Sequence, residues 1–278
     1  MKRKHAIVTG TSSGFGMLIA IELAKAGFAV ISTMRNLEKA EPLLKLAADH
    51  QVADLIHASQ LDVTSAESIR RFKDSLSTFE CIDVLVNNAG FAAGGFCEEL
   101  SIEDYRLQFE TNVFGLIEVI QAVLPTMRKN QSGRIINISS ISGRFGFPGL
   151  SPYTSSKHAL EGFSESLRLE LKPNGIDVVL IEPGSYKTNI WAALDNIPLD
   201  PGSPYHSYLE AIMENINHDK DAHGNPLEVA ELVSRLASQK KTPKLRYPIG
   251  KGVKINLFIK TIMPWKTLER IILNKLLK

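Results

Sequence analysis

Short apolar runs alternate with longer amphipathic stretches along the first two thirds of the chain. The runs are continuous rather than alternating, which is typical of parallel strands covered on both faces. The expected strands are HAIVT (5–9), FAVIST (28–33), LIHASQL (55–61), IDVLVN (82–87), GRIINISS (133–140) and IDVVLIEPG (176–184), with long helices at 102–127 and 153–171. This order predicts an α/β fold: a doubly wound, Rossmann-like parallel sheet flanked by helices on both faces.

The rhythm breaks after the sixth expected strand. Residues 185–241 form proline-punctuated helical pieces that carry apolar and aromatic side chains, among them Trp191, Leu194, Ile197, Tyr205 and Tyr208. Ligands of doubly wound sheets bind beyond the carboxyl ends of the strands, so we expect a small substrate lobe here. The alternative is a helical pair that only packs against the sheet. No linker interrupts the chain, so 1–278 is expected to be one domain.

The C-terminal extension, residues 253–278, is basic and apolar at helical spacing. Three interpretations stay open for it: packing on its own domain or on a partner subunit, a lid over an apolar substrate, or peripheral contact with a membrane surface. We favour the first.

Composition narrows the class of protein. Thirty-two lysines and arginines against thirty aspartates and glutamates give a formal charge of +2, unlike the concentrated basicity of a nucleic-acid binder. Two cysteines cannot build a disulfide framework, and the apolar stretch after the basic start is too short for a signal peptide. No stretch is expected to span a membrane, because charged residues interrupt the best candidate. We therefore expect a cytoplasmic protein.

A glycine-rich turn follows the first strand. In AIVTGTSSGFG, Gly10, Gly14 and Gly16 lead into a helix. Glycine permits a tight turn and lets backbone N–H groups approach a pyrophosphate at the helix N-terminus. The turn predicts a dinucleotide site, although simple turn chemistry would use the same residues.

The end of the second strand indicates which dinucleotide is bound. Folds that prefer NAD place a carboxylate there to bind the ribose hydroxyls. Here Met34 and Arg35 occupy that place, and an arginine can pair with the 2′-phosphate of NADP. We predict NADP(H) over NAD(H), the alternative being a merely solvated arginine.

Tyr153 and Lys157 are four residues apart on an expected helix, so both can point into one crevice. A free tyrosine has a pKa near 10, and a nearby cation favours the phenolate. The pair therefore predicts acid/base chemistry tuned by the lysine, with an incidental pair on an amphipathic helix as the alternative.

Six motifs in order resemble the short-chain dehydrogenase/reductase family, in its compact single-domain branch. They are TGTSSGFG, NNAG, TNVFG, INISS, YTSSK and PGSYKT, and they span residues 9 to 188.

The resemblance implies roles for individual residues. Tyr153 would be the general acid/base, Lys157 its activator, Ser140 the group that holds the substrate oxygen, and Asn112 the anchor of a water-linked proton path. The cofactor would be bound by Gly10, Ser12, Ser13, Gly14, Phe15, Gly16, Arg35, Asp62, Val63, Asn88, Ala89, Gly90, Tyr153, Lys157, Pro183, Gly184 and Thr188. Many NADP-using relatives carry a basic residue where Ser13 stands, which would leave Arg35 as the main 2′-phosphate partner, helped by Ser12.

The expected activity is hydride transfer between NADP(H) and a carbonyl or alcohol. The apolar lobe resembles that of hydroxysteroid- and retinol-type members, so the expected substrate is bulky and apolar. The alternatives are a 3-oxoacyl-thioester reductase of the same family and a non-catalytic NADP(H)-sensing regulator. We expect a homo-oligomer, either a dimer or a tetramer.

Overall fold

A computed structural model describes residues 3–188, 200–219 and 223–276. The chain forms a seven-stranded sheet in the order β3-β2-β1-β4-β5-β6-β7, and all of its pairings are parallel. The strands are β1 (His5–Thr9), β2 (Ala29–Met34), β3 (Ile56–Gln60), β4 (Val84–Asn87), β5 (Gly133–Ile138), β6 (Ile176–Pro183) and β7 (Arg246–Ile249). The predicted doubly wound sheet is confirmed, and all six expected strands are present within two residues of their expected ends.

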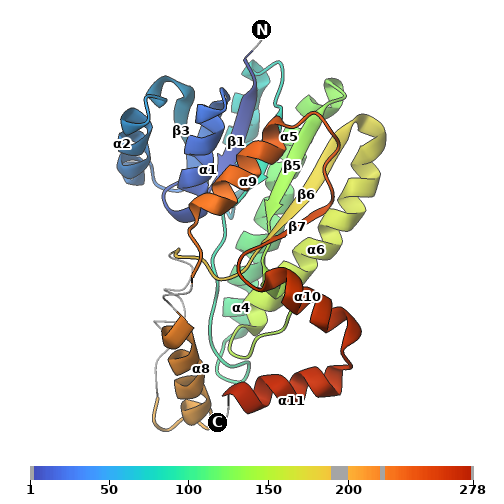
Figure 1. The fold of residues 1–278 in the computed structure, drawn as a ribbon. Helices are drawn as coiled ribbons and strands as arrows, with labels where there is room; N and C mark the ends of the chain where they lie inside the picture. The colour runs from blue at the N-terminus through green and yellow to red at the C-terminus, as the bar shows by residue number, and fades with distance from the viewer. Residues whose placement is uncertain (1–2, 189–199, 220–222, 277–278) are drawn as a thin grey trace.

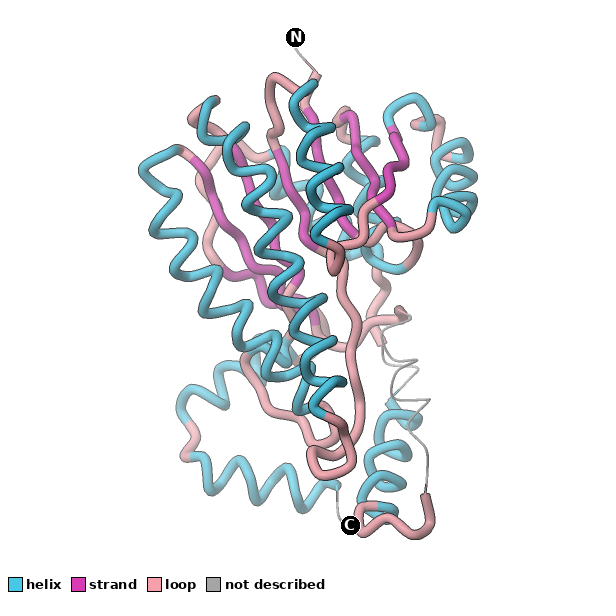
Figure 2. The backbone as a smooth tube through the Cα atoms, turned by 180° about the vertical axis from the view of Figure 1, so that it is seen from behind, coloured by secondary structure: helices cyan, strands magenta, loops and turns pink. Residues whose placement is uncertain are grey.

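Helices cover both faces of the sheet, as Figures 1 and 2 show from opposite sides. One face packs against α1 (Gly14–Lys25), α2 (Glu41–Asp49) and α9 (Leu227–Ser238). The other packs against α3 (Ala66–Ser75), α5 (Gly115–Lys129) and α6 (Ser151–Leu171). Neighbouring strand residues alternate between the two layers: Val8 packs in the first and Ile7 in the second. Both faces are therefore apolar, which explains the continuous apolar runs in the sequence. Short 3-10 turns lie at η1 (Leu37–Ala40), η2 (Ala53–Leu55), η3 (Leu76–Thr78), η5 (Ile141–Gly143) and η6 (Lys172–Asn174).

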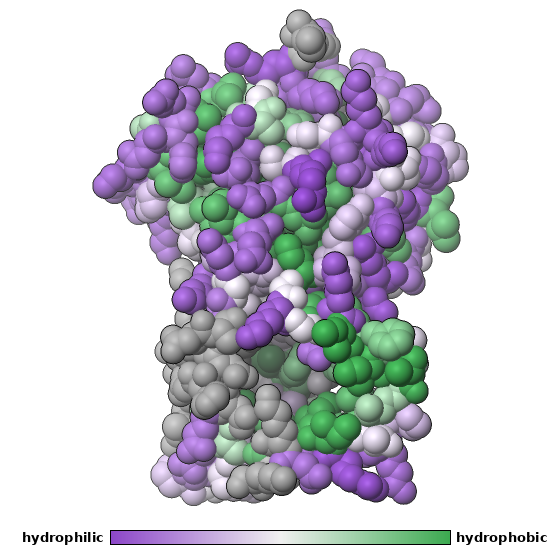
Figure 3. All heavy atoms as spheres, viewed as in Figure 1, coloured by the Kyte–Doolittle hydropathy of each residue, from purple (hydrophilic) through white to green (hydrophobic). Residues whose placement is uncertain are grey.

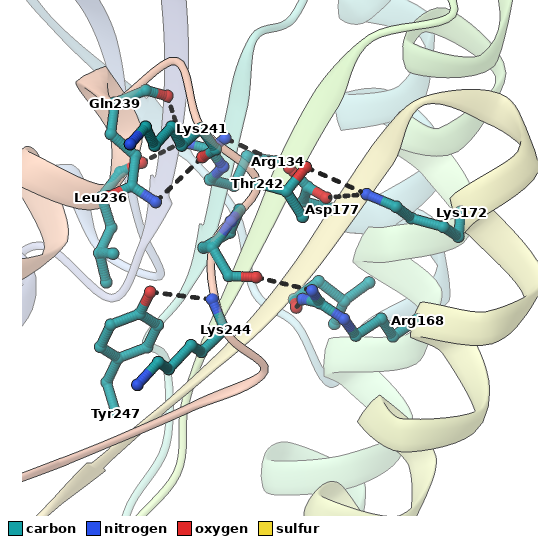
Figure 4. Close-up of polar contacts among 12 residues, drawn as sticks. Arg134, Arg168, Lys172, Asp177, Leu236, Gln239, Lys241, Thr242, Lys244 and Tyr247 are labelled. Atoms are coloured by element: carbon teal, nitrogen blue, oxygen red, sulfur yellow. Dashed lines mark hydrogen bonds and ion pairs between the residues drawn. The ribbon is translucent and has the colours of Figure 1, made fainter.

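The seventh strand, β7, was not expected from the sequence. It is short and half-buried, and it contains Pro248, so it lacks the apolar signal of the other strands. The segment before it is fastened to the sheet by polar contacts, drawn in Figure 4. Arg168 donates to the Pro243 carbonyl at 2.6 Å, and Lys172 bonds Thr242 at 3.3 Å and Asp177 at 3.0 Å. The contacts of Arg168 in α6 and Lys172 in η6 therefore hold the segment that leads into β7.

Helix α9 belongs to the helical layer rather than to a substrate lobe. Its buried residues, including Val229 and Val233, pack in the same core as α1, and Ser234 donates to the Glu22 carbonyl at 2.9 Å. The expected lobe of residues 185–241 is therefore too long at its C-terminal end. Trp191, Leu194 and Ile197 lie outside the described residues.

The expected helix at 102–127 is three consecutive pieces: α4 (Ile102–Phe109), a π-turn η4 (Glu110–Phe114) and α5. By length and composition alone, Ile102–Lys129 could cross a membrane. Half of its most apolar window is buried inside the protein, as in the core helix of a globular domain.

Among the described residues, three helices lie beyond the carboxyl ends of the strands: α8 (His206–Asp219), α10 (Val253–Ile262) and α11 (Trp265–Leu276) (Figure 1). Helix α8 packs Leu209 and Ile212 against Phe96 of the loop after β4, and Phe96 stacks on Tyr205 with ring centroids 4.4 Å apart. Leu276 of α11 packs on the same cluster. This side of the sheet is thus enclosed by elements distant in sequence.

Candidate active site

The glycine turn after β1 is built by close backbone approaches. Gly10 and Gly14 have φ values of +71° and +57°, which favour glycine. A Cβ on Gly16 would lie 2.2 Å from the Gly10 carbonyl oxygen, so helix α1 can start this close to the strand only with glycine there. The turn therefore has a structural reason for each of these glycines.

The first turn of α1 is available to an anion. Ser13 is its N-cap residue, yet its side chain accepts no capping hydrogen bond, and no acidic residue lies in the first turn. Uncapped N–H groups and the positive end of the helix dipole attract a phosphate. The turn thus fits the pyrophosphate of a dinucleotide.

Asn88 and Ala89, which follow β4, hold this turn in place through hydrogen bonds. The Asn88 amide donates to the carbonyls of Thr9 and Gly10 at 2.9 and 3.0 Å. The backbone N–H groups of Asn88 and Ala89 both donate to the Thr9 hydroxyl at 3.0 Å. The NNAG motif therefore fixes the turn, while Gly90 lies against Asn112, whose amide oxygen would be 3.0 Å from a Cβ at Gly90.

The segment after β6 lies beside the same turn. Phe15 contacts the Tyr186 ring edge-on, with centroids 5.5 Å apart, and a Cβ on Gly14 would lie 3.9 Å from Thr188. Pro183 is buried at the end of β6, and Gly184 follows it. Gly14 of the first motif and Thr188 of the last motif, both predicted to bind the cofactor, therefore lie close together.

Three further predicted cofactor residues lie at the ends of β2 and β3. Arg35 follows β2 directly, and its side chain is exposed. The carboxylate of Asp62 accepts from the Thr64 backbone at 3.0 Å and hydroxyl at 2.8 Å, which fixes the loop after β3. Val63 packs against Gly115, where a Cβ would lie 2.2 Å from the Val63 carbonyl oxygen.

Ser140, Tyr153 and Lys157 converge at the carboxyl end of β5. Ser140 follows the strand, and its side chain forms a hydrogen bond with the Tyr153 hydroxyl. Helix α6 begins at Ser151, two residues before the expected start, and places Tyr153 and Lys157 on one buried face. The Lys157 Nζ donates to the Ile138 carbonyl at 2.8 Å and lies 5.7 Å from the centre of the Tyr153 ring.

Burial dominates the titration of this pair. It raises the pKa of Tyr153 to about 12, against the opposing effect of the Ser140 hydrogen bond. It lowers the pKa of Lys157 to about 8, while the charge of Glu161 acts in the opposite direction. The sequence-based expectation that Lys157 lowers the Tyr153 pKa does not hold for the protein without its cofactor, because the buried phenolate loses hydration.

Asn112 lies in the π-turn η4 and is buried. Its amide nitrogen donates to the Phe91 carbonyl at 3.0 Å and the Ser156 hydroxyl at 3.2 Å, and its oxygen accepts from the Phe91 N–H at 3.2 Å. The amide thus joins the loop after β4 to α6. Such π-turns are often found at functional sites, and the role of Asn112 in a proton path stays a prediction.

Sequence reasoning missed a buried ionic cluster behind Lys157. Glu161, one helical turn further along α6, accepts from the Ser139 hydroxyl at 2.6 Å and pairs with Arg246 of β7 at 2.8 Å. Arg246 also contacts Glu182 at 3.3 Å, and Glu182 pairs with Arg144 at 3.2 Å. Glu161 and Glu182 lie 85 and 64 positions before Arg246, so no local sequence signal links them and only the fold shows them together.

A hollow of about 290 Å³ opens beside the segment that joins Ser140 to Tyr153. It is lined mainly by apolar and aromatic side chains of that segment, α8 and α11: Gly146, Phe147, Pro148, Tyr208, Trp265, Glu269, Ile272 and Leu273. An apolar molecule would find more contact there than a polar one.

The sequence is similar to a known protein family and to several known proteins. Residues 4–197 match the family model described as short chain dehydrogenase. An uncharacterized oxidoreductase of Bacillus subtilis (strain 168), YusZ, is 54% identical over 280 residues, covering 99% of each chain. A 3-ketodihydrosphingosine reductase of Bacteroides thetaiotaomicron is 32% identical over 94% of this chain and 93% of its own.

Solved structures agree with these relatives. A variant of actinorhodin polyketide ketoreductase with NADPH superimposes with a TM-score of 0.78, at 30% identity, over 90% of this chain and 97% of its own. The shared fold, the ordered motifs and the family match together show that the chain is an oxidoreductase that belongs to the short-chain dehydrogenase/reductase family.

Proposed function

We propose that the protein interconverts a carbonyl and an alcohol by hydride transfer with NADP(H), on a bulky apolar substrate. The convergence of Ser140, Tyr153 and Lys157, at the same carboxyl edge of the parallel sheet as the glycine turn, carries this proposal. A hydroxyl donor, a phenol and an ammonium group at one point form a proton-transfer site for an oxygen-bearing carbon.

A bound nicotinamide would supply or accept the hydride. In the reductive direction Ser140 donates a hydrogen bond to the carbonyl oxygen, and Tyr153 gives that oxygen its proton. Burial keeps Tyr153 protonated at neutral pH, which suits a donor. Lys157, held by the Ile138 carbonyl, places its positive charge beside the phenol and favours the phenolate left behind. Oxidation of an alcohol reverses these steps.

Preference for NADP(H) is supported by the end of β2. Arg35 is exposed directly after the strand, where NAD-preferring folds place a carboxylate. A guanidinium there can bind a 2′-phosphate with two hydrogen bonds. The similar polyketide ketoreductase structure contains NADPH.

An apolar substrate is supported by the lining of the hollow beside α11. The names of two relatives agree: 3-ketodihydrosphingosine reductase and human retinol dehydrogenase 8, the latter 40% identical over 66% of this chain and 60% of its own. The alternative, a 3-oxoacyl-thioester reductase, would need a basic patch for an acidic carrier. Arg144, two residues before Gly146 of the hollow, is already paired with Glu182.

The test is a substrate panel with the full chain, following NADPH oxidation and NADP reduction. Long-chain ketones, steroids, retinoids, 3-oxoacyl thioesters and small sugars form its classes. We expect the highest kcat/KM with an apolar carbonyl or alcohol. A higher kcat/KM with sugars or acyl thioesters would reject the proposed apolar substrate class. Cofactor binding with no turnover of any class would reject the enzymatic proposal.

A further inference from the structure

Helix α10 and the start of α11 expose a C-terminal apolar face, which we define as Ile255, Phe258, Ile262 and Trp265. Each of these side chains is between 59% and 65% exposed. Ile255, Phe258 and Ile262 follow the i, i+3, i+7 spacing that places them on one side of α10. Figure 3 shows hydrophobic side chains gathered on the part of the molecule that carries α10 and α11, with hydrophilic side chains along its lower border.

This face is not what holds the two helices to the protein. Val253 and Leu268, on their inner sides, are buried. Lys260 donates to the Arg144 carbonyl and lies 5.0 Å from the centre of the Phe145 ring. The inner sides of the two helices therefore hold them to the protein. The apolar face is a separate, exposed surface, and packing within the chain does not explain its apolar side chains.

Basic residues accompany the face. Residues 251–278 contain six lysines and one arginine against one carboxylate, Glu269, although the whole chain carries a formal charge of only +2. Lys251, Lys254, Lys266 and Arg270 are exposed. A twofold contact between copies would bring this positive surface against itself, which is unfavourable. An anionic lipid surface complements both the apolar side chains and the charge.

We propose that α10 and α11 dock the protein onto an anionic lipid surface, with the C-terminal apolar face in the headgroup region and the surrounding lysines on the lipid phosphates. Trp265 also lines the hollow described above, so docking holds that hollow at the lipid boundary. The docking does not depend on the proposed activity, and its test measures binding alone.

The experiment is sedimentation of the full chain with phosphatidylcholine vesicles that contain or lack phosphatidylserine. We expect binding to the anionic vesicles only, weakening as salt rises. The substitution Phe258→Asp should lower the partition coefficient at least tenfold. Replacing Lys251, Lys254 and Lys266 by Gln should lower it by roughly a hundredfold, because each lysine near an anionic surface contributes about fivefold.

Matched controls separate the face from general effects. Leu169→Asp changes an apolar residue that is 77% exposed on α6, and a triple Gln substitution at the exposed Lys45, Lys73 and Lys129 removes the same charge elsewhere. Both should bind as the unaltered protein does.

Trp265 gives a second readout. The chain has two tryptophans, so Trp191→Phe leaves Trp265 alone. Its emission should shift to shorter wavelength with anionic vesicles and be quenched by brominated lipid. Equal binding to both vesicle types, or unchanged binding of Phe258→Asp, would overturn the proposal. A Phe258→Asp protein that loses oligomer mass in analytical ultracentrifugation while keeping vesicle binding would assign the face to a second copy instead.

Discussion

At the scale of single residues, burial shifts the pKa values of Tyr153 and Lys157, the proposed proton-transfer pair, in opposite directions. It disfavours the charged form of each, so the pKa of Tyr153 rises to about 12 and that of Lys157 falls to about 8. At neutral pH the phenol keeps its proton and most of the lysine remains charged. A protonated phenol with a cation beside it is the state that the proposed carbonyl reduction requires of this pair.

At the same scale, the proposed preference for NADP(H) rests on Arg35. Arg35→Ala should raise the KM for NADPH by about ten- to a hundredfold, since charge-assisted hydrogen bonds to phosphate contribute roughly 1.5–3 kcal/mol. The KM for NADH should stay the same. Steady-state kinetics with both cofactors measures this, with Lys39→Ala as a control that removes another exposed cation three residues beyond Asn36. Equal efficiency of the unaltered enzyme with NADH and NADPH would contradict the preference.

The sequence predicted the site residues because they lie in local motifs next to strand ends. Tyr153 and Lys157 share a helix turn, and Ser140 follows an obvious apolar strand. Glu161 could not be assigned in this way, because its partner Arg246 is 85 residues away on a strand without an apolar pattern.

At the scale of elements, the first residue of α10 packs directly against the segment after β6 and limits how closely the two can approach each other. A Cβ on Gly184 would lie 2.6 Å from a methyl carbon of Val253, and Gly184 donates to the Ile249 carbonyl at 2.9 Å. Helix α10, β7 and the predicted nicotinamide border are therefore packed as one unit.

Gly184→Ala should displace this unit, destabilise the protein by about 1–3 kcal/mol through overpacking, and raise the KM for NADPH. Adding Val253→Ala removes the clashing methyl group and should restore much of both losses. Urea unfolding and kinetics of the two single variants and the double variant form the cycle. Additive losses in the double variant would show that the Gly184–Val253 contact is not the cause.

Helices and strands could be predicted from the sequence where the hydrophobic periodicity alone identifies them. The six apolar strands and the helices between them follow from burial on both faces. Helix α9 was assigned to the substrate lobe because periodicity shows that a helix has an apolar side but not which element it packs against. Strand β7 was missed because polar contacts from Arg168 and Lys172, rather than an apolar run, hold the segment before it.

At the scale of the whole molecule, one buried ionic cluster joins α6, β6, β7 and η5. Glu182 is its most buried member, and its Oε2 atom has no hydrogen-bond partner among the described residues. Burial, followed by the charge of Glu161, raises the pKa of Glu182 to about 7, although Arg144 and Arg246 oppose this. The folded protein therefore binds a proton that the unfolded chain releases.

This cluster makes stability depend on pH. A raised carboxyl pKa stabilises the folded state at low pH, and the contribution is lost as pH rises from about 4.5 to about 7. Glu182→Gln should flatten this decline by roughly 1–3 kcal/mol between pH 5 and 7.5. Urea midpoints across that range measure it, with Glu165→Gln as the control for an exposed partner of Arg246. An unchanged slope would show that Glu182 does not hold the proton.

Tyr153→Phe removes the proposed proton donor, and Tyr247→Phe is a control that removes a tyrosine hydroxyl from β7. Two quantities are measured on each protein: the Kd for NADPH and kcat with the best substrate of the panel. We expect a Kd close to that of the unaltered enzyme and a kcat lowered by roughly 10²- to 10⁴-fold for Tyr153→Phe only. A Tyr153→Phe protein that keeps its kcat would contradict the assignment of Tyr153 as the proton donor and, with it, the proposed reaction at this site.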